Sequence, residues 1–116
     1  MPRNCRARSK EFALRNLKLF RSLSRSADAQ IVGKQLLRSA MSTAANYRAA
    51  CRSRSSAEFI AKLGIVEEEA DESAYWMELI IDGGLLSKNK VDALRQEAGE
   101  LTAIMAASRL SASGWK

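Results

Sequence analysis

The chain has 116 residues, of which 47% are hydrophobic, which is enough for one modest core in a single domain. Its 6 glycines and 1 proline are too few for the turns of a β-sandwich, while the residues that favour helices are plentiful. Because histidine is absent, the commonest general base and the usual zinc and di-iron ligands are missing. We therefore expect an all-α protein with no metal, no cofactor and no enzymatic activity.

The net charge of +6 is unevenly distributed along the chain. Residues 1–54 contain 13 lysines and arginines against 2 acids, whereas the rest contains 6 against 11. Such an asymmetry predicts that the basic half contacts either a polyanion or an acidic surface, including one on another copy of this chain. The charges alone leave both alternatives open.

The cysteines and the N-terminal sequence indicate in which cellular compartment the protein is expected. Cys5 and Cys51 lack the C-x-x-C spacing of a metal clip or a redox pair. The basic N-terminus is followed by an amphipathic segment, which is unlike a secretory leader, and no stretch approaches the roughly 18 apolar residues of a membrane span. We expect a cytoplasmic protein with free thiols and no membrane contact.

The first predicted helix covers residues 9–26 and follows a basic arm of residues 1–8. Ser9 is its expected N-cap, because a serine hydroxyl accepts hydrogen bonds from the free amides of a first turn. The side opposite its apolar face carries cations, and Leu14 falls there, so it is either partly exposed or in contact with another subunit. The apolar face consists of Phe12, Ala13, Leu17, Leu19, Phe20 and Leu23.

The second predicted helix covers residues 28–52, with Asp28 suited to a helix N-terminus. One side, spaced by threes and fours, is apolar or small and consists of Val32, Leu36, Ser39, Thr43, Asn46, Tyr47 and Ala50. The opposite side is a basic stripe of Lys34, Arg38, Met41, Ala45, Arg48 and Arg52.

Two further helices are predicted over residues 56–82 and 88–111, leaving residues 112–116 as a tail. Ser55-Ser-Ala-Glu58 fits a capping box, in which Ser55 caps the Glu58 amide and Glu58 reaches back to the Ser55 amide. The third helix has a heptad seam of Phe59, Leu63, Val66, Ala70, Ser73, Met77 and Ile80, and the fourth has one of Val91, Leu94, Ala98, Leu101, Met105 and Ser108. Short connectors then favour an antiparallel up-down-up-down four-helix bundle over residues 9–111.

Three features resemble reactive sites, but packing or solvation explains them better. The acidic run of residues 67–72 has no histidines and no matching carboxylate pairs, so we favour a solvated or ion-pairing face over a metal site. Tyr75 and Trp76 suit packing better than base stacking, because no phosphate-binding loop accompanies them. Cys51 is near several arginines, but no histidine is present to act as its base.

The basic stripe and the N-terminal arm of Arg3, Arg6, Arg8 and Lys10 are the strongest functional signal, although charged runs often serve only solubility or subunit pairing. From the residues alone, nucleic-acid binding through phosphate contacts and a structural scaffold are equally open alternatives. The candidate nucleic-acid ligands are Lys34, Arg38, Arg48, Arg52, Arg15 and Lys18. The candidate subunit-interface residues are Glu68, Glu72, Tyr75 and Trp76.

Several short sequence motifs over about residues 12–110 resemble those of a known family and occur in the same order. They are Gln35-Leu-Leu-Arg38-Ser39-Ala40 with Ser42, Ala45 and Asn46, then Arg54-Ser55, Ser56-Ala-Glu58-Phe59-Ile60, Glu69-Ala-Asp71-Glu72, Tyr75-Trp76-Met77-Glu78-Leu79 and Glu97-Ala-x-Glu100-Leu101. In these motifs the chain resembles the proteins encoded by intervening sequences of 23S ribosomal RNA genes. Family members often have Asn-x-x-Glu-Gly where this chain has Asn46-Tyr-Arg-Ala-Ala, so the charge around Arg48 is reversed.

The resemblance implies a closed four-helix bundle that assembles as a ring-like homopentamer without known enzymatic activity. Similar proteins serve as accessory factors to reverse transcriptases in diversity-generating retroelements, where a basic pentamer binds nucleic acid and the polymerase. The partners implied here are therefore other copies of the chain, RNA or DNA, and a reverse transcriptase or a ribosomal component.

Overall fold

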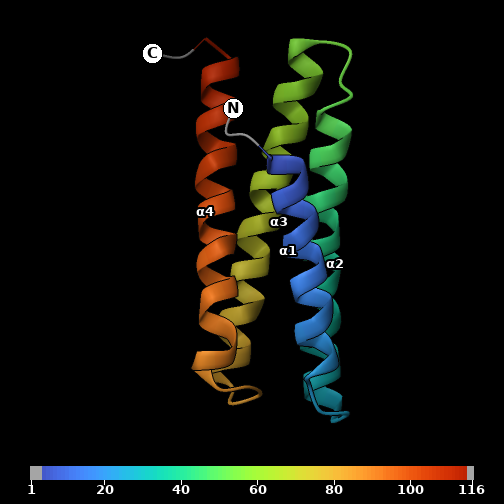
Figure 1. The fold of residues 1–116 in the computed structure, drawn as a ribbon, viewed down its shortest axis with the longest axis vertical. Helices are drawn as coiled ribbons and strands as arrows, with labels where there is room; N and C mark the ends of the chain where they lie inside the picture. The colour runs from blue at the N-terminus through green and yellow to red at the C-terminus, as the bar shows by residue number, and fades with distance from the viewer. Residues whose placement is uncertain (1–3, 115–116) are drawn as a thin grey trace.

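The computed structural model describes residues 4–114, which form four helices with no strand in that range. The helices are α1 (Cys5–Arg21), α2 (Ala27–Ala50), α3 (Ser56–Asp82) and α4 (Lys88–Ala112). Successive helices run antiparallel in a rod of 46 × 23 × 20 Å (Figure 1). The predicted all-α fold of four packed helices is confirmed. Residues 1–3 of the predicted arm and 115–116 of the predicted tail lie outside the described residues.

Helix α1 begins at Cys5, four residues before its predicted start. Its buried seam includes Cys5, Ser9 and Asn16 between the apolar positions, at steps of four and three. The prediction that Ser9 is the N-cap is wrong, because Ser9 is inside the helix, 1% exposed, and its hydroxyl donates to the Arg6 carbonyl at 3.2 Å. Residues 5–8 are therefore part of the bundle, since Cys5 continues the buried face of the helix.

The predicted core faces of the other helices are confirmed almost residue for residue. Leu36, Leu63, Val91 and their neighbours in the seams are buried, and Phe59 packs against the core from its edge. Between α2 and α3 the Ser39 and Ser73 hydroxyls are 2.9 Å apart. Each of these hydroxyls also contacts a carbonyl of its own helix, so the small side chains allow a close approach without unpaired hydroxyls.

Helix α1 contacts its two neighbouring helices to different extents. Helix α1 packs mainly on α2, and its contact with α4 is much smaller. Arg8 connects it to α4 through Glu97, with two contacts of 2.7 Å, and through Glu100 at 2.6 Å. Near the other end, Gly33 of α2 leaves room for α1, because a Cβ at that position would lie 2.8 Å from Phe20 Cδ1.

Candidate nucleic-acid interface

Ion pairing separates the predicted basic stripe into two parts. Arg38, in the middle of α2, bonds Glu69 on α3 at 2.9 Å and also contacts Glu72. These carboxylates raise the pKa of Arg38, and the hydrogen bond to Glu69 is the largest cause. Arg38 therefore connects two helices of the bundle, and its charge is already compensated.

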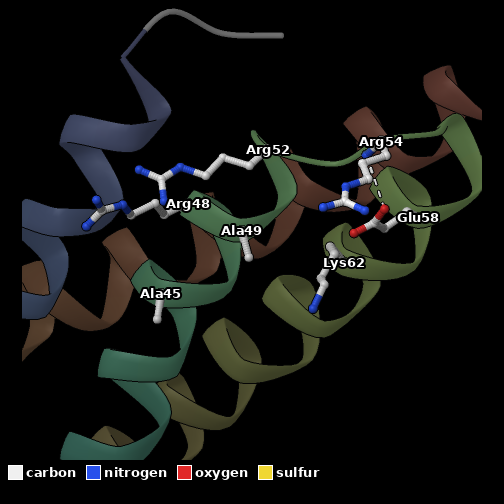
Figure 2. Close-up of a pocket in the computed structure, with 7 residues that line it drawn as sticks. All are labelled: Ala45, Arg48, Ala49, Arg52, Arg54, Glu58 and Lys62. Atoms are coloured by element: carbon white, nitrogen blue, oxygen red, sulfur yellow. Dashed lines mark hydrogen bonds between the residues drawn. The ribbon is translucent and has the colours of Figure 1, made fainter.

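Arg48 and Arg52, near the end of α2, make no ion pair within residues 4–114. They line a hollow of about 470 Å³ between the end of α2 and the start of α3, which we call the α2–α3 hollow. Figure 2 shows these two arginines on one side, Arg54 and Lys62 on the other. Its floor is made by Ala45 and Ala49, and its charged lining is completed by Glu58.

Glu58 is the single carboxylate of the α2–α3 hollow. As predicted, the Ser55 hydroxyl accepts from the Glu58 amide at 3.1 Å and caps α3. The second half of the predicted capping box is wrong, because Glu58 Oε2 accepts from the Arg54 amide at 3.1 Å and not from that of Ser55. The carboxylate thus holds the turn that carries Arg54 (Figure 2).

A second hollow, of about 690 Å³, lies between α1 and α2, and we call it the α1–α2 hollow. Its cations are Arg6 and Lys10 of α1 and Arg48 of α2, so Arg48 lines both hollows. The two hollows together form one basic surface at the end of the bundle where the chain passes from α2 to α3, the upper end in Figure 1.

The other predicted nucleic-acid ligands do not join this surface. Arg15 and Lys18 line a separate depression between α1 and α4, with Lys90. Lys34 is exposed on α2 and lines neither hollow. The six predicted residues are therefore distributed over several places, and only Arg48 and Arg52 are in the basic surface.

Four cations of the basic surface are not among the six predicted ligands: Arg6, Lys10, Arg54 and Lys62. Arg6 and Lys10 were predicted only as part of the basic N-terminal arm, and Arg54 and Lys62 were missed. The late predicted start of α1 placed Arg6 in a separate arm. The buried seam from Cys5 through Ser9 was the signal that brings Arg6 and Lys10 onto the bundle. Lys62 follows Glu58 by one helical turn, and that spacing alone places it beside the capping turn.

The four residues of α3 predicted to form a subunit interface also fall into two groups, those that bond within the chain and those that are exposed. Glu72 accepts from Trp76 Nε1 at 3.0 Å, and this bond, followed by Arg38, lowers the pKa of Glu72. Trp76 packs against the core, as predicted, whereas Tyr75 is 52% exposed and meets the Trp76 ring edge-on at 5.1 Å. Glu68 is exposed. Glu72 and Trp76 therefore stabilise their own chain, and only Glu68 and Tyr75 face outward.

The remaining chemistry of the described part is sparse. No group of three or more acidic or cysteine side chains in residues 4–114 is arranged to hold a metal ion. None of the helices formed by those residues is long and apolar enough to cross a membrane. Cys5 is buried and Cys51 exposed, and both thiols are free. Burial, with both thiols nearby, raises the pKa of the Tyr47 hydroxyl.

Comparison with known proteins identifies the family. The family model described as 23S rRNA-intervening sequence protein matches residues 4–107. This chain belongs to that family. A crystal structure from Bacteroides thetaiotaomicron, described as a protein with unknown function from the S23 ribosomal protein family, is similar with a TM-score of 0.83 and 32% identity over 90% of this chain and 96% of that one. No curated protein matches significantly.

The sequence motifs that carry the family resemblance contain residues that form ion pairs between the helices of the bundle. Glu69, Glu72 and Arg38 meet between α2 and α3, and Glu97 and Glu100 hold Arg8 of α1. The departure from the family pattern falls elsewhere, at Ala49 in the floor of the α2–α3 hollow. With alanine at that position, Glu58 is the single carboxylate that lines the hollow.

Proposed function

We propose that this protein is a non-enzymatic, nucleic-acid-binding four-helix bundle that contacts the phosphate backbone through its basic surface. The observation that carries the proposal is the set of cations without carboxylate partners within residues 4–114: Arg6, Lys10, Arg48, Arg52, Arg54 and Lys62. Phosphate contacts of this kind give affinity without reading the base sequence.

Placement on a rigid element supports the proposal. Arg48 is in the last turn of α2, and Arg52 is in the turn that follows the helix, where its amide donates to the Ala49 carbonyl at 3.0 Å. The cap of α3 holds Arg54 opposite them. Gathering several uncompensated charges has a cost from mutual repulsion, which a bound polyanion removes. A homopentamer, which we propose from the family resemblance, would present this surface five times and increase the avidity for a long strand.

A salt titration of RNA and DNA binding tests the function. In the variant Arg48→Ala/Arg52→Ala, the slope of log affinity against log salt should flatten by about 0.7 per lost contact on a single strand and about 0.9 on duplex DNA. The matched control Arg21→Ala/Arg25→Ala removes the same charge at the opposite end of the rod, where both residues are exposed. Equal slopes for both variants would contradict the proposed surface, and no binding at about 50 mM salt would favour the scaffold hypothesis.

Subunit pairing needs a separate test, because Glu72 already pairs with Arg38 in its own chain. Reversing Glu72 would disturb the bundle, whereas Glu68 is exposed and makes no ion pair within residues 4–114. We expect Glu68→Lys to lower the mass measured by sedimentation if the acidic face of α3 meets a basic face of a neighbouring subunit. An unchanged oligomer would contradict that pairing, and a monomeric wild type would contradict the pentamer.

A further inference from the structure

The basic stripe of α2 has an uncharged gap between Arg38 and Arg48. Met41 and Ala45 occupy it, and Met41 is 38% exposed although it is a large apolar side chain. Both residues line the α1–α2 hollow. The gap is thus an apolar depression within a basic surface, and it needs an explanation that phosphate binding alone does not give.

The lining of the α1–α2 hollow combines two kinds of chemistry. Its apolar part consists of Ala7, Ala13, Met41, Ala44 and Ala45. Its charged part consists of Arg6, Lys10 and Arg48, and no carboxylate lines it. A ligand that satisfies both parts has an apolar group attached directly to an anion.

We propose that the α1–α2 hollow receives an unpaired nucleobase of a single strand whose phosphates are bound by the surrounding cations. This inference rests on the proposed function and adds that the protein prefers single-stranded RNA or DNA to duplex. In a duplex the bases are stacked and paired, so none is available to enter. In a single strand a base can turn out of the stack and pack against side chains.

The side chains in the hollow suit such a base. A thioether such as that of Met41 makes favourable contacts with aromatic rings, and guanidinium planes such as that of Arg48 stack on bases. Because Arg48 lines both hollows, a strand with a base in the α1–α2 hollow can continue with its phosphates along Arg52 and Arg54 of the α2–α3 hollow.

An acidic amphipathic peptide would also combine negative charge with apolar groups, but the layout favours a nucleic acid. Beyond the α1–α2 hollow the basic surface continues over a floor of alanines only, Ala45 and Ala49. An amphipathic helix presents large apolar residues on every turn, and the α2–α3 hollow offers them no large apolar side chain to pack against. A phosphate chain with one inserted base needs only the single apolar depression.

The test compares a single strand with an abasic strand of the same length, which has the same phosphates and no bases. We expect wild-type protein to bind the abasic strand and the matching duplex about five- to tenfold more weakly than the normal single strand at equal salt. The variant Met41→Ser should lose most of this difference and leave duplex affinity unchanged. Met41→Leu, which keeps the apolar side chain, should retain most of it.

The outcomes separate this inference from the proposed function. Equal binding of normal and abasic strands, or of single strand and duplex, would overturn the base site and leave the phosphate surface intact. No binding of any strand, together with tight binding of polyglutamate, would overturn both and assign the surface to an acidic protein. The wild-type comparison needs no substitution, so it stands even if a Met41 variant folds poorly.

Discussion

The middle and the end of the α2–α3 pair use the same residue type in opposite ways. In the middle, Arg38 bonds Glu69 and contacts Glu72, which also holds the Trp76 indole. At the end, Arg48 and Arg52 face Lys62 and Arg54 and have no carboxylate within ion-pairing distance among residues 4–114. An arginine stripe on one helix therefore has no fixed role, because the facing helix decides which arginines stabilise the fold and which remain available to a ligand.

Placing a carboxylate at the unpaired end should change the binding most. In Lys62→Glu the hollow loses one cation and gains an anion facing Arg48 and Arg52, so we expect affinity for single-stranded RNA to fall by about tenfold or more at low salt. Fluorescence anisotropy over a salt series measures it. Lys88→Glu is the control, because it makes the same charge change at the other end of the rod. An equal loss in both variants would mean that net charge, and not the site, controls affinity.

The turn that joins α2 to α3 at the unpaired end depends on the cap of α3. Ser55→Ala removes the acceptor for the Glu58 amide and should lower the free energy of unfolding by about 1 kcal/mol. Urea denaturation followed by circular dichroism gives this value. Ser56→Ala is the matched control, because Ser56 is the first residue of α3 and not its cap. A comparable loss in that control would contradict the assigned cap.

Removing the paired arginine should affect stability and not binding. Arg38→Ala leaves Glu69 and Glu72, which are three residues apart on α3, without the arginine they share, and we expect a loss of about 0.5–1 kcal/mol of unfolding free energy, since the pairs are partly exposed and screened. Its salt slope for nucleic acid should match that of wild type. A flattened slope would place Arg38 in the binding surface after all and remove the distinction between the two regions.

The smallest expected effect is a change in the pH dependence of stability, and it also concerns the paired region. The lowered pKa of Glu72 means that its ionised form is favoured in the folded protein relative to its unfolded value of 4.5. Its stabilising contribution is complete above that value and is lost as the pH falls through the lower, folded pKa. Glu72→Gln should therefore lose stability less steeply than wild type on acidification below about pH 5, as measured by thermal melts. Parallel curves would contradict this contribution.

Periodicity was sufficient to predict the helices and the core but not the composition of the site. The bounds of α3, residues 56–82, and the seams of α3 and α4 follow from heptad spacing and a cap. The start of α1 was wrong because Cys5, Ser9 and Asn16 are buried although two of them are polar. Polarity conceals such positions, since a buried serine or asparagine can bond a carbonyl of its own helix, as Asn16 does with Phe12 at 2.9 Å.

The site depended on which residues face each other across helices, and one helix alone cannot show this. Arg38 and Arg48 occupy equivalent places on the α2 stripe, and only the antiparallel register with α3 separates them. That register was in principle available, because the turn near Ser53 places Arg48 near Lys62 and Arg38 near the acidic run. The late predicted start of α1 also left Arg6, which completes the surface, in an arm outside the bundle.

The attachment of α1 has a consequence for how the protein opens. α1 has 17 residues against 24 to 27 in the other helices, and the buried Asn16 Oδ1 has no hydrogen-bond partner among the described residues. We expect such an element to undock at a lower free energy than the rest and its amides to exchange hydrogen faster than those of α3. Arg6 and Lys10 move away with α1 when it undocks. The apparent affinity for nucleic acid is then the affinity of the docked form multiplied by the fraction of molecules in which α1 is docked. Salt therefore lowers the apparent affinity in two ways, because it screens both the phosphate contacts and the ion pairs of Arg8 that connect α1 to α4.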